Sequence, residues 1–118
     1  MSIMTELLEK PGVIAAGQYA YRGDRFSYKG GLSEEEARKA SIMCRATTMG
    51  TTMESEMLGS LGLRNGLSPV RGWVVRCAEN SVVVVANVFC FVSNDAGSIN
   101  AVLGFMREQL ADQAMDLI

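Results

Sequence analysis

The chain has 118 residues, 48% of them hydrophobic and 20% charged, which is typical of a single globular domain. Eleven basic and thirteen acidic residues give a net charge of −2, which disfavours a nucleic-acid partner because binding to phosphates needs a basic face. The chain contains no histidine, so it lacks the commonest general base and the commonest ligand of transition metals.

The first quarter of the chain predicts a short helix followed by a hairpin. Residues 4–9 favour a helix that Thr5 could cap, and residues 13–20, small and apolar at first and alternating later, favour a strand. Residues 22–25 contain glycine and aspartate, which tolerate the backbone of a turn, and a second strand begins at Phe26. These two strands are predicted to pair as an antiparallel hairpin.

The clearest local signal marks the start of a long central helix. Ser33 followed by Glu36 is a capping box, in which each side chain bonds the exposed backbone N–H of the other residue. We therefore predict a helix over residues 34–58. Residues 59–68 are rich in glycine and predict a loop or a frayed helix end, without the sequence of a phosphate-binding loop.

The predicted central helix is unusually poor in charge after Arg45. Flexible or small apolar residues share one of its faces: Ile42, Met43, Ala46, Met49, Met53 and Met57. A helix with apolar residues on several faces needs cover on more than one side. We favour core filling as the role of the methionines, and the alternative is a contact surface for a second subunit.

The most apolar part of the chain, residues 70–92, predicts three strands. Two strands joined by a two-residue turn are expected over residues 71–78 and 81–86. Asn87 tolerates a left-handed backbone, so residues 88–92 favour a further antiparallel strand. One long bent strand in place of the last two is the alternative.

An amphipathic helix is predicted to close the chain. Ser93, Asn94 and Asp95 supply capping residues, and an apolar stripe at i, i+3 and i+4 spacing runs from Ile99 to the chain end. The complete order is α-β-β-α-β-β-β-α. This order favours an α+β fold in one domain, residues 1–118, with a five-stranded antiparallel sheet flanked by helices.

The sequence offers little that catalysis could use. Serine and cysteine nucleophiles exist, but no histidine is present to activate them. Cys44, Cys77 and Cys90 form no closely spaced pair, and we interpret them as buried free thiols of a reducing compartment. We therefore predict no catalytic residue, no metal ligand and no cofactor. Six basic residues are interpreted as scattered solvated charges, and the alternative is that they form a basic patch: Arg22, Arg25, Lys29, Arg64, Arg71 and Arg76.

No segment suggests targeting or insertion into a membrane. The first ten residues carry acids in place of the basic region of a signal peptide. The longest apolar run, residues 82–86, is far shorter than the roughly 20 residues of a membrane-spanning helix. The predicted location is the cytoplasm, without a membrane partner.

The predicted element order, with several short motifs, resembles a known superfamily. The chain is similar to roadblock/dynein-light-chain domains, of the longin/profilin-like type, in its opening segment PGVIAAGQYAYRGDRFSYKG. It most resembles a group of small stand-alone bacterial and archaeal proteins of uncharacterised function in the motifs LLEKPGVIAAG, YKGGLSEE, MCRATT and PVRGWVV. The resemblance covers nearly the whole chain.

This resemblance implies assembly. Roadblock domains are typically homodimers in which the central helices pack together and the sheets join edge to edge. Mapped onto this chain, the resemblance places these residues at the dimer interface: Ala46, Met49, Gly50, Met53, Met57, Val70, Gly72 and Val74. It also implies a non-enzymatic scaffold or regulatory module, whose partners are a second copy of itself and a small GTPase or a larger protein complex.

Two other functions stay open. A small-ligand sensor would hold its ligand between the sheet and the helices, although core packing accounts for the same aromatic residues. The candidate lining residues of that pocket are Tyr19, Tyr28, Trp73 and Phe89. An enzyme would have to use Cys44 or Cys90 as its nucleophile. The sequence itself names neither a partner protein nor a ligand.

Overall fold

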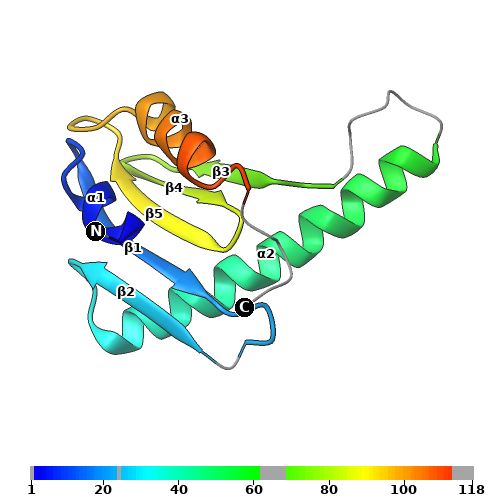
Figure 1. Cartoon of the computed structure of the whole chain (residues 1–118), viewed down its shortest axis with the longest axis horizontal. Coiled ribbons are helices and arrows are strands. Elements are labelled where there is room, and N and C mark those ends of the chain that lie inside the picture. Colours follow the sequence, from blue (N-terminus) through cyan, green and yellow to red (C-terminus); the bar gives the residue numbers. More distant parts are fainter. Residues whose placement is uncertain (1, 24, 62–68, 113–118) are drawn as a thin grey trace.

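A computed structural model describes residues 2–23, 25–61 and 69–112. It contains one five-stranded antiparallel sheet, with one long helix on one face and two short helices on the other (Figure 1). The elements in chain order are α1 (Ile3–Leu8), β1 (Val13–Tyr19), β2 (Phe26–Gly30), α2 (Glu34–Ser60), β3 (Gly72–Arg76), β4 (Asn80–Val85), β5 (Val88–Ser93) and α3 (Ile99–Gln109). The predicted order and the predicted α+β class are both confirmed.

The sheet has the strand order β2-β1-β5-β4-β3, so the two hairpins lie on either side of β5. All neighbouring strands pair in antiparallel fashion. The alternative of one long bent strand is wrong, because β4 and β5 are separate strands that pair with each other from Val85 opposite Val88 outward. As a result, β2 and β3 form the two edges of the sheet.

The period of two along each strand divides the core into two layers. Side chains on one face of the sheet pack against α1 and α3, in a cluster that includes Val83, Cys90 and Met106. Side chains on the other face pack against α2, in a cluster that includes Val84 and Phe89. Because β4 and β5 are covered on both faces, nearly every residue in them is buried, which explains their continuous apolar sequence.

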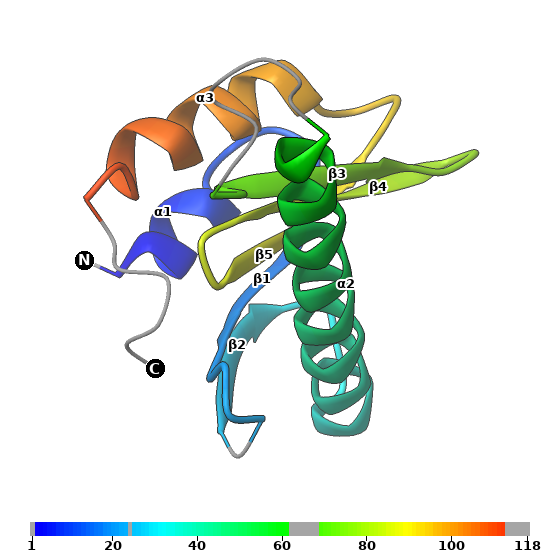
Figure 2. The same cartoon turned by 90° about the vertical axis from the view of Figure 1, so that its right-hand side faces the viewer.

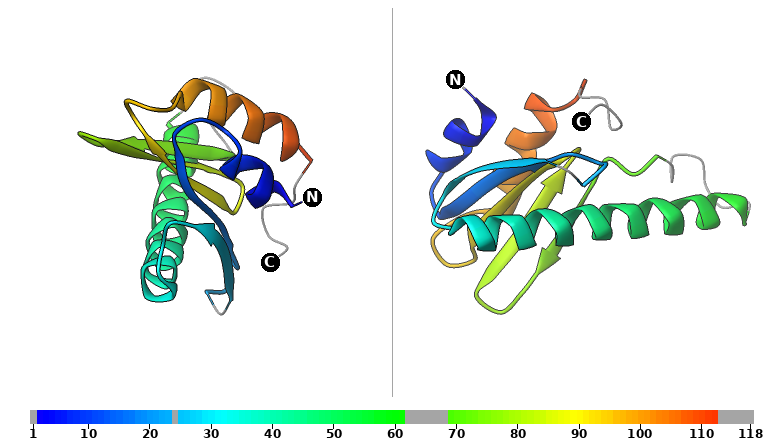
Figure 3. Two further views of the ribbon diagram at one scale, coloured as in Figure 1. Left: turned by 90° about the vertical axis from the view of Figure 1, so that its left-hand side faces the viewer. Right: turned by 90° about the horizontal axis from the view of Figure 1, so that it is seen from below.

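Helix α2 begins where the capping box predicts. The Ser33 backbone N–H donates to Glu36 Oε1 over 2.8 Å, and the Glu36 backbone N–H donates to Ser33 Oγ over 3.1 Å. The helix continues to Ser60, two residues beyond the predicted end. Its C-terminal part extends past the sheet, as the first view and the view from below show (Figures 1 and 3).

Two predicted helix caps are wrong. The cap of α1 is Ser2, whose Oγ accepts a bond of 3.2 Å from the Thr5 backbone N–H. The cap of α3 is Ser98, which accepts from the Ala101 backbone N–H over 3.1 Å, and residues 93–95 lie in β5 and the turn before this cap. Each serine accepts from the backbone N–H three residues further along the chain, in the first turn of its helix. The predicted candidates do not stand at this distance from the first turn of the helix.

Predictions about the turns and the chain end also need correction. Ala86, and not Asn87, has the left-handed backbone of the β4–β5 turn, with φ of 55°. Asn87 is fully buried, and its Nδ2 donates to the Tyr19 carbonyl over 2.8 Å. Helix α3 ends at Gln109 and does not run to the chain end. Of the predicted loop over residues 59–68, the first two residues are helical, and residues 62–68 lie outside the described part of the chain.

Candidate interaction surface

One face of α2 is apolar and exposed. The buried residues of α2 are small or of moderate size: Ala37, Ala40, Ser41, Cys44, Thr48 and Ser55. The helical period places the methionines on the opposite side, where Met49 is 53% exposed, Met53 64% and Met57 62%. We call this the methionine face, and it comprises Ile42, Met43, Ala46, Met49, Gly50, Met53 and Met57.

The methionine face brings together the five residues of α2 that the resemblance placed at a dimer interface. All five are exposed, and they share one side of the helix. Core filling, the role we favoured for the methionines, is therefore wrong for those of α2. It holds for Met106 of α3, which is fully buried.

Strand β3 presents an open edge next to this helix. It pairs with β4 on one side, and the Cys77 N–H and the Arg71 carbonyl both bond to that strand. Because bonding alternates along an antiparallel strand, the backbone groups of Gly72, Val74 and Arg76 face away from β4. The predicted edge residues Gly72 and Val74 thus have backbone donors and acceptors directed to the open side, and the Val74 side chain is 39% exposed.

A groove lies where α2 passes the start of β3. Its volume is about 540 Å³, and it is open to solvent. The residues that line it are mainly apolar or uncharged: Tyr21, Thr48, Met49, Thr52, Met53, Glu56, Pro69 and Val70. Val70, a predicted interface residue that precedes β3, therefore lies beside two members of the methionine face.

A hydrogen-bonded cluster fixes β3 against α2. The hydroxyl of Thr48, a buried residue of α2, lies 2.8 Å from the Tyr19 hydroxyl and accepts a bond of 2.8 Å from Trp73 Nε1. Burial raises the pKa of Tyr19 to about 12, so its phenol is neutral at ordinary pH. Sequence reasoning missed Thr48, because nothing in the local pattern shows which threonine of a helix meets an indole.

The four aromatic residues proposed for a ligand pocket do not gather around one cavity. Phe89 is fully buried and Tyr19 is 2% exposed, so both belong to the core. Trp73 is half-buried in the cluster with Thr48, and Tyr28 stacks on Phe26 at the other edge of the sheet. The arrangement supports core packing.

The two buried thiols, Cys44 and Cys90, are poorly suited to act as nucleophiles. Cys44 and Cys90 are fully buried, and burial raises the pKa of each thiol to about 12. A reactive cysteine needs the opposite shift, because the thiolate is the nucleophile. Cys77 is exposed at the β3–β4 turn, so its predicted burial is wrong. All three cysteines are free.

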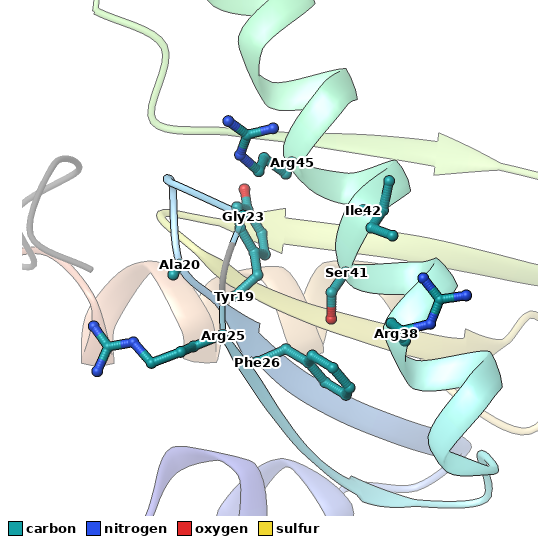
Figure 4. A pocket seen from close by; sticks show the side chains of 9 residues that line it. All are labelled: Tyr19, Ala20, Gly23, Arg25, Phe26, Arg38, Ser41, Ile42 and Arg45. Carbon is teal, nitrogen blue, oxygen red and sulfur yellow. The ribbon is translucent and has the colours of Figure 1, made fainter.

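A second, smaller pocket lies between the β1–β2 turn and the first half of α2 (Figure 4). Its volume is about 180 Å³. The residues around it are Tyr19, Ala20, Gly23, Arg25, Phe26, Arg38, Ser41, Ile42 and Arg45. We predicted that Arg25 is one of several scattered charges, whereas the fold groups it with two arginines of α2 that the sequence did not single out.

The described ranges contain no group of three or more potential metal ligands among His, Cys, Asp and Glu. Within the same ranges, every helix is too short or too polar to cross a membrane.

Comparisons with known proteins give a family and a fold. A family model described as "Uncharacterized conserved protein (DUF2173)" matches residues 3–108. Among solved structures, the chain is similar to a Roadblock/LC7 domain from Streptomyces avermitilis, with a TM-score of 0.54, 17% identity, and coverage of 92% of this chain and 95% of that chain. None of the curated proteins matches the chain. The likeness confirms the roadblock-like fold expected from the sequence.

Proposed function

The chain belongs to the DUF2173 family of uncharacterised conserved proteins, and we propose that it is a homodimeric, non-enzymatic protein-interaction module of the cytoplasm. The observation that carries this proposal is the methionine face next to the open edge of β3. Monomeric proteins rarely expose a large contiguous apolar patch, and such a patch marks a contact site. Three free cysteines agree with a reducing compartment.

An antiparallel pair of α2 helices would bring the methionine faces of two copies together. A two-fold axis at Gly50 places residue i opposite residue 100 − i of the second copy. Met43 then lies opposite Met57, seven residues on either side of the axis. Gly50 has no neighbouring atom within 4 Å of an added Cβ, so it leaves space for close approach at the crossing point.

The open edge of β3 favours the same partner. An unpaired edge strand is a template for association unless it is covered or paired. A second copy that packs along α2 also reaches β3, because Thr48 holds this strand against the helix. Pairing of the two β3 edges would bond the outward backbone groups of Gly72, Val74 and Arg76 and extend the sheet across the dimer.

Within this proposal, the dimer serves as a scaffold or regulatory platform. The partner class that its roadblock-like fold suggests is a small GTPase or a larger protein complex. This step rests on likeness of fold, and no described residue identifies the partner.

Cysteine crosslinking tests the proposed helix arrangement. In a Cys77→Ser background, which removes the exposed native thiol, the combined variant Met43→Cys and Met57→Cys should form a disulfide between two chains under mild oxidation. Within one chain the two positions are 14 helical residues apart, about 21 Å, so they cannot form an intramolecular disulfide. A non-reducing gel should therefore show a band of twice the chain mass.

The single variants are the matched controls. Met43→Cys alone and Met57→Cys alone place identical positions far apart in the antiparallel pair, so neither should crosslink efficiently. Crosslinking of a single variant as fast as the combined variant would indicate random collision and contradict the arrangement. Absence of a crosslinked band in the folded combined variant would contradict it as well.

A further inference from the structure

The pocket of about 180 Å³ beside the β1–β2 turn has an apolar interior and a basic rim (Figure 4). The ring of Phe26, Ile42 of α2 and Ala20 contribute its apolar part, and Arg25, Arg38 and Arg45 contribute the charges. No acidic side chain lines it among the described residues. Pockets that bury a cofactor or a drug-sized ligand measure about 300–1,000 Å³, so this one is suited to a single side chain.

The three arginines differ in what they already bind. Arg38 donates from Nε and Nη2 to the Glu35 carboxylate, over 3.1 and 2.6 Å, so its charge is largely compensated. Arg45 lies across Gly23 and donates from Nε to the Tyr21 carbonyl, which fixes its side chain at the turn. Among the described residues, neither the terminal nitrogens of Arg45 nor the guanidinium of Arg25 has an acceptor.

The positions of these guanidinium groups decide which anion suits the pocket. They lie at separate places around the rim and do not converge on one point (Figure 4). A single phosphate is bound best by donors that converge on it, because each oxygen then accepts charge-assisted bonds. Separate carboxylates along a peptide can each meet one arginine, while an apolar side chain between them fills the interior.

We propose that this pocket docks an acidic segment of a partner protein, with carboxylates on Arg25 and Arg45 and one apolar side chain above Phe26. The segment binds on the flank of α2 that faces the β1–β2 turn, at the border of the methionine face, with which the pocket shares Ile42. The inference deepens the proposed interaction role, because it names the chemistry of a partner other than a second copy. It rests on that role, but it does not depend on dimerisation.

An NMR titration with a defined peptide tests the inference. The probe is the acetylated and amidated pentapeptide Glu-Glu-Leu-Glu-Glu, and its matched control replaces each glutamate by glutamine. The acidic peptide should shift the backbone amide signals of Gly23 and Ser41, and added salt should weaken the binding because the contacts lie at the surface. The glutamine peptide should produce no shifts.

Arginine variants locate the site. Arg25→Gln combined with Arg45→Gln should weaken binding by about tenfold or more, the loss expected for charged hydrogen bonds. Arg25→Gln alone should weaken it several-fold. This variant should fold normally, because the Arg25 side chain makes no hydrogen bond or ion pair with the described residues. Arg107→Gln on the exposed side of α3 makes the same charge change outside both proposed contact sites and should leave the affinity unchanged.

Several results would overturn the inference. These are equal binding of the glutamine peptide, equal loss in the Arg107→Gln variant, or no response to the acidic peptide. Inorganic phosphate that produces the same shifts with the same affinity would also overturn it, since the site would then bind simple anions. Sedimentation of the unmodified protein separates the two proposals. A dimer that shows no response to the acidic peptide refutes the docking site alone, and a monomer that binds the peptide refutes dimerisation alone.

Discussion

At the scale of single residues, the Thr48 hydroxyl joins the two parts of the proposed interface. It is buried, and it contacts Tyr19 of the core and Trp73 of the edge strand. Helix α2 supplies the methionine face and β3 supplies the open edge, so this hydroxyl sets their relative position. Buried polar groups of this kind stabilise one arrangement, because a lost partner leaves donors unsatisfied.

Replacing Thr48 by valine should therefore destabilise the fold while preserving the shape of the side chain. The Trp73 N–H and the Tyr19 hydroxyl lose their shared partner, and we expect a loss of about 1–3 kcal/mol in the free energy of unfolding. Urea titration at fixed protein concentration, followed by the fluorescence of the only tryptophan, measures this loss. The control is Thr47→Val, because the half-buried Thr47 side chain makes no hydrogen bond within the described part of the chain. Equal stability of the two variants would contradict the role assigned to Thr48.

At the scale of elements, β1 and β5 fit together because one residue of β1 has no side chain. Gly17 lies opposite Phe89, and a Cβ built on it would stand 2.2 Å from Phe89 Cζ and 2.8 Å from the Ser27 carbonyl oxygen. The aromatic ring alone cannot relieve both contacts, since the second is with the backbone of β2. The close packing of three strands on the α2 side depends on this glycine.

Gly17→Ala should lower the thermal midpoint of unfolding, because overpacking of this kind costs about 1–3 kcal/mol or more. Gly104→Ala is the matched control, because Gly104 lies in α3 with nothing within 4 Å of an added Cβ. In an open helical position the same substitution should stabilise by about 0.5–1 kcal/mol and raise the midpoint. Changes of the same sign in both variants would contradict this account of Gly17.

The elements were largely predictable because their signals are local. The capping box at Ser33 and Glu36 located the start of α2, and the apolar run of residues 70–92 indicated three strands. The left-handed residue of the β4–β5 turn was not predictable, because the tertiary bond of Asn87 to Tyr19 decides which residue takes that backbone. Local preference for asparagine pointed to the neighbouring position.

The candidate surfaces were predictable only in part. Helical spacing grouped the methionines on one face, but their exposure depends on where α2 lies against the sheet. The grouping of Arg25 with Arg45 was not predictable, because it arises when the β1–β2 turn folds against α2. The exposure of Cys77 likewise follows from the early end of β3 at Arg76.

At the scale of the whole molecule, the two layers of helices are unequal. The face covered by α1 and α3 carries a closed core cluster, whereas α2 covers the other face and keeps an exposed apolar side of its own (Figure 2). Its C-terminal part extends beyond the sheet (Figure 3), and Met53 and Met57 in this part are 64% and 62% exposed. A second copy across Gly50 would cover this surface and the edge of β3 together.

Sedimentation equilibrium at micromolar concentrations tests this central claim most directly, with Met53→Glu as the disrupting variant and Ala101→Glu on the exposed side of α3 as its charge-matched control. Met53 is 64% exposed, so a glutamate there should leave the monomer folded while burying a charge in the dimer. The account predicts a mass of twice 12.7 kDa for the unmodified protein and for Ala101→Glu, and 12.7 kDa for Met53→Glu. A mass of 12.7 kDa for the unmodified protein throughout this concentration range would contradict it.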